Sequence, residues 1–133
     1  SMKSLRGAQQ MNALLSIKPK YVEKILDGKK IYEYRRIIFK EKIEKVIIYS
    51  TKPIGKIVGE FEVDNILSSS PATLWRNTKN SSGITKEYFN KYFNGKKTAF
   101  AIKIKNPKEY DIPKDLKTII PNGIPPQSFC YVR

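Results

Sequence analysis

The sequence contains no histidine and only one cysteine, and both facts limit the chemistry that the protein can perform. Without histidine, histidine-based acid–base pairs, Ser-His and Cys-His nucleophile pairs and nearly all zinc sites are excluded. Cys130 alone cannot form a disulfide within the chain, which is typical of a reducing compartment. We therefore expect no metal and no cofactor, and any catalysis must use lysine, carboxylate, tyrosine or hydroxyl groups.

Long apolar segments are also lacking. No stretch approaches the roughly 18 to 20 apolar residues of a membrane span, and residues 3–10 have no apolar signal-peptide core. Ser1-Met2 is interpreted as an expression remnant, residues 1–10 as a disordered N-terminus, and the protein is expected to be cytoplasmic, with no membrane partner. Residues 11–133 have the length of one domain with a modest core.

Acidic residues are few: 12 Asp and Glu face 26 Lys and Arg, a net charge of +14. Such an excess opposes folding through self-repulsion, so it usually indicates a polyanionic partner, most often nucleic acid. The alternative is a lysine-rich, AT-rich genome that makes many proteins basic. An even spread of lysines would favour that alternative, whereas a basic face around residues 28–35 would favour nucleic acid.

Apolar periodicity and turn residues predict a mostly β domain with two or three short helices. Pro19 and Gly28 bound an amphipathic helix, Pro71 precedes a short helix over 72–77, and Thr85 and Gly95 cap a helix over 86–94. Residues 64–83 otherwise form a polar stretch, and residues 106–126, with five prolines, an irregular arm. Strands are predicted over residues 11–17, 31–38, 46–49, 56–63, 97–105 and 128–132.

One short motif follows the first helix. The order strand, Lys18-Pro19, helix, Gly28-x-Lys30-x-x-Glu33-x-Arg35, strand resembles the ASCH family, a branch of the PUA-like β-barrels. The resemblance implies an α+β fold, a small barrel of about six strands flanked by two or three helices, with a cleft that receives RNA, DNA or a modified base. Members are described as RNA-binding or transcription-associated; some bacterial relatives hydrolyse N4-acetylcytidine, and others are ribonucleases.

The resemblance also implies catalytic positions. The amidohydrolase-type triad combines a lysine, a threonine three residues later and a glutamate from a barrel strand. Lys30 fits the first position, Glu33 occupies the place of the threonine, and Glu60 or Glu62 is the candidate strand carboxylate. The triad lacks its threonine.

Lys30 and Glu33 admit three interpretations. A surface ion pair would contribute about 0 to 1 kcal/mol. An acid–base pair requires burial that lowers the pKa of the lysine. A binding pair would use Lys30 for a phosphate and Glu33 for a base amino group. Arg35, on the same strand face as Glu33, suits a phosphate or guanine edge or a cross-strand pair, and Lys18 would join them in the cleft.

Further candidates lie outside the motif. Ser50 and Thr51, where a strand enters a turn, would bind phosphate or simply form the turn. Trp75 would stack on a base as part of a lid, or anchor the polar stretch to the core. The four aromatic residues of the 86–94 helix suit a core face, with a stacking platform as the alternative.

The sequence thus predicts a binding module for nucleic acid, RNA or DNA, or for a modified nucleoside, with Lys18, Lys30, Glu33 and Arg35 in its cleft. The first alternative is a metal-independent hydrolase of acylated nucleosides or a ribonuclease that uses Lys30 with Glu33 and Glu60. The second alternative is a protein-interaction domain.

Overall fold

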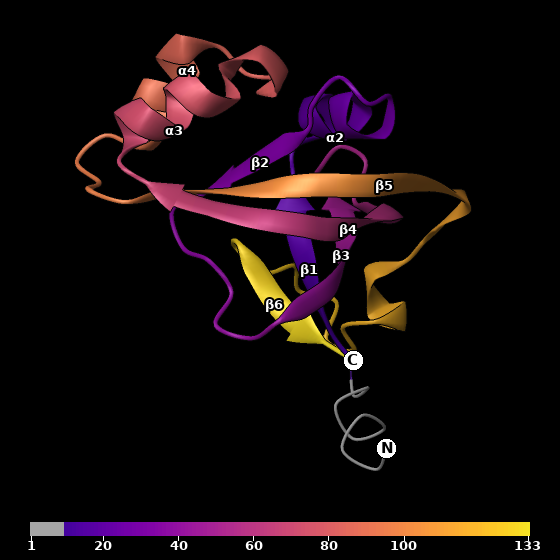
Figure 1. Cartoon of the computed structure of the whole chain (residues 1–133). Helices are drawn as coiled ribbons and strands as arrows, with labels where there is room; N and C mark the ends of the chain where they lie inside the picture. The colour runs from indigo at the N-terminus through magenta and orange to yellow at the C-terminus, as the bar shows by residue number, and fades with distance from the viewer. Residues whose placement is uncertain (1–9) are drawn as a thin grey trace, which may run out of the picture.

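The computed structural model describes residues 10–133 (Figure 1), so the prediction for residues 1–9 lies outside the described part. Six strands form one sheet in the order β2-β5-β4-β3-β1-β6. The strands are β1 (Met11–Ile17), β2 (Tyr32–Arg35), β3 (Ile43–Ser50), β4 (Lys56–Ser69), β5 (Ala99–Lys114) and β6 (Phe129–Val132). The α-helices are α2 (Pro19–Leu26), α3 (Pro71–Thr78) and α4 (Lys86–Tyr92), with 3₁₀ turns η1 (Lys79–Ser81) and η2 (Leu116–Thr118).

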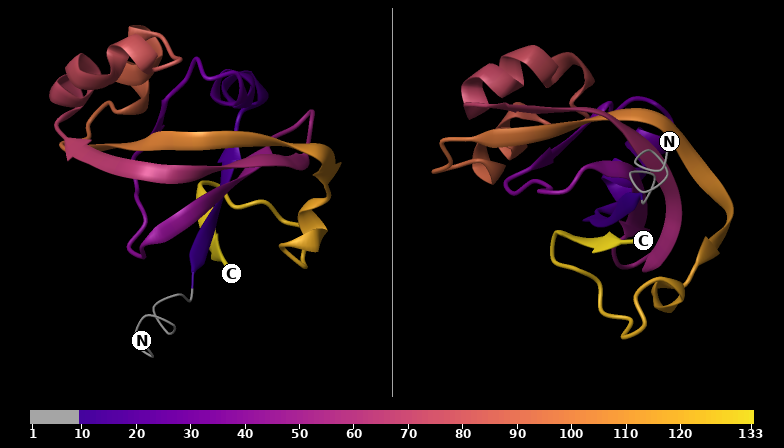
Figure 2. Two further views of the ribbon diagram at one scale, coloured as in Figure 1. Left: turned by 45° about the vertical axis from the view of Figure 1, so that its right-hand side comes forward. Right: turned by 60° about the horizontal axis from the view of Figure 1, so that its bottom comes forward.

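The sheet is mixed and curls into a half-barrel. β1 and β3 are parallel, and every other strand pair is antiparallel. Figure 2 shows the long strands β4 and β5 curving around the other strands, while β2 and β6 are the two ends of the sheet. The predicted α+β barrel with flanking helices is confirmed, and its open side lies between β2 and β6.

The helices begin and end where local sequence chemistry directs them. Pro19 occupies the first turn of α2, where its missing N–H is not needed, and Gly28 ends the segment at φ +83°. Thr85 caps α4, its Oγ1 accepting a hydrogen bond from the Tyr88 N–H at 3.1 Å. α3 and α4 lie side by side over one end of β4 and β5, apart from α2 (Figure 1). The three predicted helices are confirmed.

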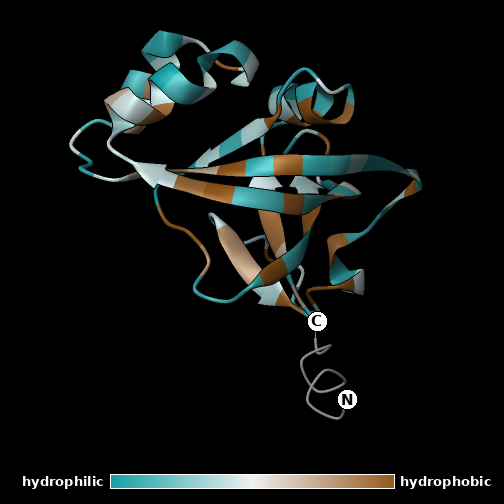
Figure 3. Ribbon diagram, in the orientation of Figure 1, coloured by the Kyte–Doolittle hydropathy of each residue, from teal (hydrophilic) through white to brown (hydrophobic). Residues whose placement is uncertain are grey.

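Two strands run much further than their sequence pattern predicts. β4 continues to Ser69 and β5 to Lys114, so 64–69 is not a loop and 106–114 is not an irregular arm. The backbone N–H and C=O groups of β4 and β5 hydrogen-bond each other from Ile57↔Lys114 to Ser69↔Ala99. This pairing keeps both segments extended although their polar residues have a low strand propensity. Figure 3 shows hydrophobic and hydrophilic residues alternating along both strands.

The two prolines within β5 lie where the pairing with β4 is interrupted. Residues 106 and 107 face one residue of β4, between the pairs Glu62↔Lys105 and Glu60↔Lys108, and residues 110–113 fall between the next two pairs. Pro107 and Pro113 therefore take positions where no ladder N–H is needed. In contrast to β4 and β5, β2 is shorter than the predicted strand over 31–38 and ends at Arg35.

Two apolar clusters carry the part of the fold that surrounds the open side. The first packs α2 against β1, β3, β4 and β5. The second packs Tyr34 of β2 against α3 and α4, through Leu74, Phe89 and Phe93. The Tyr34 hydroxyl also shares a 2.7 Å hydrogen bond with Thr78 Oγ1, which ties α3 to β2. The second cluster thereby fixes α4 beside the open side of the half-barrel.

The aromatic residues of α4 divide between two environments. Phe89 and Phe93, one turn apart, are buried in the second cluster, at 0% and 2% exposure. Tyr88 and Tyr92, on the neighbouring face, are only partly buried and border the open side. The prediction of a core face therefore holds for the two phenylalanines, and the platform alternative describes the position of the two tyrosines.

This division predicts different costs for truncating adjacent residues. Phe89→Ala removes a fully buried ring and leaves a cavity, so we expect the free energy of unfolding to fall by about 3 to 5 kcal/mol. Tyr88→Ala is the matched control and should show a clearly smaller decrease, because its ring already contacts solvent. Urea denaturation of both variants measures the difference; equal decreases would contradict the division.

Candidate functional site

A cavity of about 620 Å³ opens on the side of the half-barrel between β2 and β6. The four residues predicted to share a cleft, Lys18, Lys30, Glu33 and Arg35, all line it. Lys18 ends the β1 segment, Lys30 follows α2, and Glu33 and Arg35 project from the same face of β2. The structure therefore brings the motif together in one place, and its role in binding remains a prediction.

The Lys30 side chain forms the buried floor of this cavity. Its residue exposure is 2%. Nζ donates to the Ser82 carbonyl at 2.6 Å, lies 3.8 Å from Glu33 Oε1, and faces the rings of Tyr34 and Tyr21 at 4.9 and 5.5 Å. Burial, with a smaller contribution from nearby cations, lowers the pKa of Lys30 from 10.5 to about 8, although Glu33 acts in the opposite direction. The surface-ion-pair interpretation of Lys30 and Glu33 is therefore wrong.

Arg35 connects the two ends of the open sheet. Its Nη2 donates to Glu33 Oε2 at 2.8 Å and to the Ser16 carbonyl of β1 at 3.1 Å. Its Nη1 donates to the Oγ and carbonyl of Ser128, just before β6, at 3.2 and 3.4 Å. Arg35 thus pairs with Glu33 along its own strand and reaches across the opening, while its buried Nε–H has no partner among the described residues.

A glycine makes room for the buried lysine. Gly83 has φ +67°, and a Cβ there would lie 2.7 Å from Cβ and Cγ of Lys30. Both the backbone conformation and the close approach therefore require glycine. Ser82 and Gly83 are functional candidates that the sequence did not single out, because their only local signal was that of a turn.

Tyrosines and cations alternate at the rim of the cavity. The rings of Tyr88 and Tyr92 stack at 6.2 Å with an interplanar angle of 11°. Lys18 Nζ lies 5.4 Å from the Tyr88 ring centroid, and the Arg36 guanidinium lies 4.3 Å from that of Tyr92. Within residues 10–133 neither Lys18 nor Arg36 makes an ion pair with a carboxylate. Arg36 was assigned no role from sequence, since alternation alone placed it opposite Glu33.

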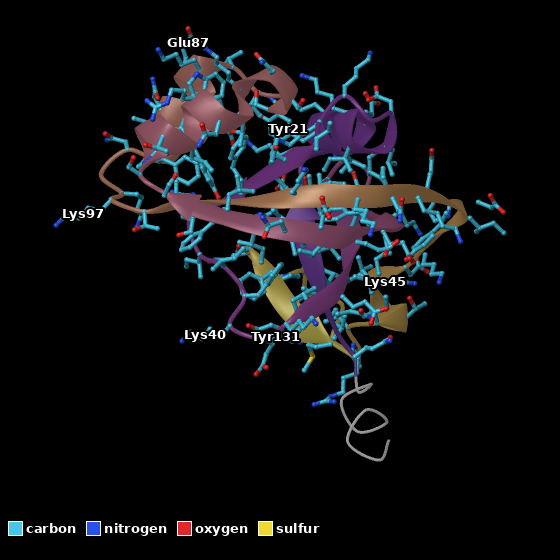
Figure 4. The ribbon with its side chains drawn as sticks, viewed as in Figure 1. Tyr21, Lys40, Lys45, Glu87, Lys97 and Tyr131 are labelled. Atoms are coloured by element: carbon cyan, nitrogen blue, oxygen red, sulfur yellow. The ribbon has the colours of Figure 1, made fainter. Side chains whose placement is uncertain are left out.

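The remaining cations are distributed more widely. Figure 4 shows Lys40, Lys45 and Lys97 projecting outward from different parts of the molecule. Elsewhere on the sheet, Lys45, Lys56 and Lys103 pair with Glu60, Asp115 and Asp64. Net charge alone therefore does not single out the cavity. Contacts between a cation and a tyrosine ring also occur elsewhere, since Lys114 Nζ lies 4.8 Å from the Tyr110 ring centroid. The cavity is distinguished by such contacts at its rim together with the buried Lys30, Glu33 and Arg35.

Glu60 does not join Lys30. Its Oε1 accepts from the Tyr110 hydroxyl at 2.8 Å and its Oε2 lies 3.2 Å from Lys45 Nζ, outside the residues that line the cavity. These contacts hold the pKa of Glu60 below its usual value despite partial burial. The predicted support of Glu60 for a reaction at Lys30 is therefore not met by the geometry.

Three other predicted binding residues also lie outside the cavity lining. Ser50 is buried at the end of β3, where it pairs with β1 and β4. The Thr51 carbonyl accepts from the N–H groups of Ile54 and Gly55, so Thr51 forms the turn. Trp75 lies in α3 with its ring centroid 4.9 Å from that of Phe89. Trp75 therefore anchors α3 to the core, which was the alternative to stacking in a mobile lid.

Side chains that could ligate a metal are scattered in the described part of the chain. Across residues 10–133, no three His, Cys, Asp or Glu side chains gather closely enough to hold a metal ion. In the same residues, no helix is long and apolar enough to cross a membrane.

Comparison with known proteins identifies the class to which this fold and motif belong. The ASCH domain model matches residues 15–108, and the chain belongs to the ASCH domain family. It is 30% identical over 124 residues to the ASCH domain-containing ribonuclease of Zymomonas mobilis, covering 91% of this chain and 84% of that protein. The crystal structure of ASCH from Zymomonas mobilis superposes with a TM-score of 0.85 at 28% identity, covering 92% of this chain and 87% of that one.

A longer protein also contains a similar sequence. The chain is 33% identical over 127 residues to ATP synthase subunit alpha of Ureaplasma parvum. The match covers 94% of this chain but spans only 16% of that relative's length.

The depressed pKa of Lys30 predicts how stability depends on pH. The unfolded state holds this proton up to about pH 10.5 and the folded state releases it near pH 8, so the contribution of Lys30 to the free energy of unfolding should rise by about 1 to 2 kcal/mol between pH 8 and about 9.5. Burial raises the pKa of the Cys130 thiol, which acts in the opposite direction over this range, so the rise is measured as the difference between wild type and Lys30→Met. Staying below pH 10 limits the contribution of the tyrosines, because Tyr21 and Tyr34 have pKa values raised to about 12 by burial and lower stability above that pH.

Urea denaturation across this pH range measures the effect. Lys105→Met, at an exposed lysine of β5, is the control and should keep the wild-type slope. Parallel curves for wild type and Lys30→Met would show that Lys30 does not titrate there.

Proposed function

We propose that this protein binds single-stranded RNA, with one nucleotide held in the cavity between β2 and β6. The observation that carries the proposal is the composition of that cavity: a buried Lys30–Glu33–Arg35 floor beneath a rim of tyrosine rings and cations. Single-stranded nucleic acid is bound by this combination, since bases stack on aromatic rings and phosphates follow positive charge. The volume of about 620 Å³ falls within the range of small-ligand pockets.

The charge balance of the cavity favours a polyanion. Glu33 is the one acidic residue in its lining, against Lys18, Lys30, Arg35, Arg36 and Lys96. Lys18, Arg36 and Lys96 are exposed and so can meet phosphates without first losing much hydration. RNA rather than DNA is proposed because the similar Zymomonas protein is described as a ribonuclease.

Two kinds of substitution separate stacking from phosphate binding. Tyr92→Ala should weaken binding of a fluorescently labelled single-stranded RNA by about 5- to 150-fold, the equivalent of ~1 to 3 kcal/mol per stacked base. Arg36→Ala should instead flatten the dependence of log affinity on log salt by about 0.7 for each phosphate that the variant no longer neutralises. Fluorescence anisotropy at several salt concentrations measures both.

Lys105→Ala is the matched control for Arg36→Ala, because it removes one positive charge from an exposed residue outside the cavity. It should leave affinity and salt slope almost unchanged. Equal effects of the two substitutions would indicate charge-driven binding over the whole surface and would count against a site in the cavity.

RNA cleavage is the second candidate function, and the buried Lys30 beside Glu33 favours it specifically. A lysine with a pKa near 8 is partly neutral at physiological pH and can accept a proton. In cleavage, the neutral amine would take the proton of a ribose 2′-hydroxyl, and the 2′-oxygen would then bond to the adjacent phosphorus. The bond from phosphorus to the 5′-oxygen breaks, that oxygen takes a proton from water, and a 2′,3′-cyclic phosphate remains.

Hydrolysis of N4-acetylcytidine has less support. Glu33 replaces the threonine of that triad, and Glu60 lies away from Lys30 in contact with Tyr110 and Lys45. Of the residues that the triad requires, only the lysine is therefore present in the cavity, as Lys30. A protein-interaction role is favoured by the wide distribution of lysines but leaves the composition of the cavity unexplained.

A pH profile tests the role of Lys30 in cleavage. With chelator present, the rate of RNA cleavage should increase as pH rises through about 8, because the neutral amine is the active form. Lys30→Met should lower the rate by about 10²- to 10⁴-fold, while Lys105→Met should not. Wild-type rates for Lys30→Met would overturn the assignment, and a rate that falls above pH 8 would make the ammonium the active form.

A further inference from the structure

We infer that the floor of the cavity selects an unpaired base whose edge carries a ring N–H beside a keto oxygen, with uracil as the best match and cytosine rejected. This inference rests on the proposed binding of single-stranded RNA and adds the class of base that the site takes. It depends on the hydrogen-bonding groups that the buried charges leave unused.

Glu33 supplies a free acceptor in the floor. Its Oε2 accepts from Arg35 at 2.8 Å, whereas Oε1 accepts no hydrogen bond from any residue in the described part of the chain. The nearest cation to Oε1 is Lys30 Nζ at 3.8 Å, beyond hydrogen-bond distance. A carboxylate only accepts hydrogen bonds, so Oε1 is free to accept one from an N–H of a ligand.

One donor lies beside this acceptor. Lys30 has three N–H groups, of which one donates to the Ser82 carbonyl at 2.6 Å, and its Nζ lies 3.8 Å from Oε1. Both Nη groups of Arg35 are hydrogen-bonded and its Nε is buried, so Arg35 holds Glu33 in place and offers no donor to a ligand. The floor thus offers a donor and an acceptor side by side, from Lys30 and Glu33.

The Watson–Crick edge of uracil is complementary to that pair in either orientation. Its ring N3–H donates one hydrogen bond, and the keto oxygen on each side of N3 accepts one. Cytosine presents an unprotonated N3 at the centre, so a lone pair would face the Glu33 carboxylate and leave it buried without a donor. Sites with buried polar groups reject ligands that leave those groups unpaired more strongly than apolar sites reject a change in size.

The same hydrogen-bonding requirement separates the two purines and favours single-stranded over double-stranded RNA. Guanine and hypoxanthine carry the keto oxygen beside a ring N–H, whereas adenine carries an unprotonated N1 beside an amino group. Within a duplex this edge is already paired, so the floor can read it only in a single strand or a loop. Stacking on the Tyr88 and Tyr92 rings at the rim would serve a base of either class, because every base has a flat face, and so would not contribute to this choice.

The test compares labelled oligouridylate and oligocytidylate of equal length by fluorescence anisotropy at one salt concentration. These strands carry the same charge, so salt-dependent contacts cancel in the ratio of their dissociation constants. We expect oligouridylate to bind about tenfold more tightly or better, in the range that a specific base contact provides. Replacing uridine by 3-methyluridine, which removes the N3–H, should abolish the preference without any change to the protein.

Glu33→Gln provides the complementary change in the protein, because a carboxamide can donate to N3 of cytosine as well as accept from N3–H of uracil. The preference should fall to near one, while Lys105→Ala keeps the wild-type ratio. Comparable binding of the two oligomers to wild type, or unaltered binding of the 3-methyluridine strand, would overturn the base selection and leave RNA binding intact. If neither oligomer binds, the proposed function itself is refuted, and the base selection with it.

Discussion

The burial of the Lys30 ammonium is the constraint on which the site depends, because a charge removed from water must be met by polar partners. Those partners come from segments far apart in the chain: Glu33 from β2, the Ser82 carbonyl from the turn after η1, and the Tyr21 ring from α2. The lysine therefore holds the α2, β2 and α3–α4 regions in one arrangement. Its lowered pKa is the measure of what that burial costs.

Arg35 extends this network across the opening of the half-barrel. A fully closed barrel would pair its end strands through backbone hydrogen bonds, but here β2 and β6 stand apart, and the Arg35 guanidinium reaches Ser16 and Ser128 instead. Glu33 is shared between Arg35 and Lys30, so the three charges position one another. An opening held by side chains remains a cavity, whereas an opening closed by a backbone ladder would not, and this preorganises the floor before a ligand arrives.

The parts of the site that sequence could predict are those set by local order. Lys30, Glu33 and Arg35 fall within one short motif that begins at a helix end, and strand alternation places Glu33 and Arg35 on one face. Residues whose roles depend on tertiary contacts were misplaced or missed. Glu60 faces Tyr110 because β4 and β5 stay paired beyond their apolar pattern, and Tyr88 and Tyr92 border the cavity because α3 buries the opposite side of α4. Likewise, nothing local to Gly83 indicates that a lysine from the end of α2, much earlier in the chain, packs against it.

The site extends beyond the residues that the family model matches. The family match ends at residue 108, yet Arg35 hydrogen-bonds Ser128, and β6 forms one end of the sheet. The site of this chain therefore includes the segment just before β6, beyond the residues that the family model matches. Nearly the whole of this chain also matches a small part of a much longer Ureaplasma protein. The cavity floor is assembled within one sheet, from the end of β1, from β2 and from the segment just before β6, because Arg35 hydrogen-bonds both Ser16 and Ser128.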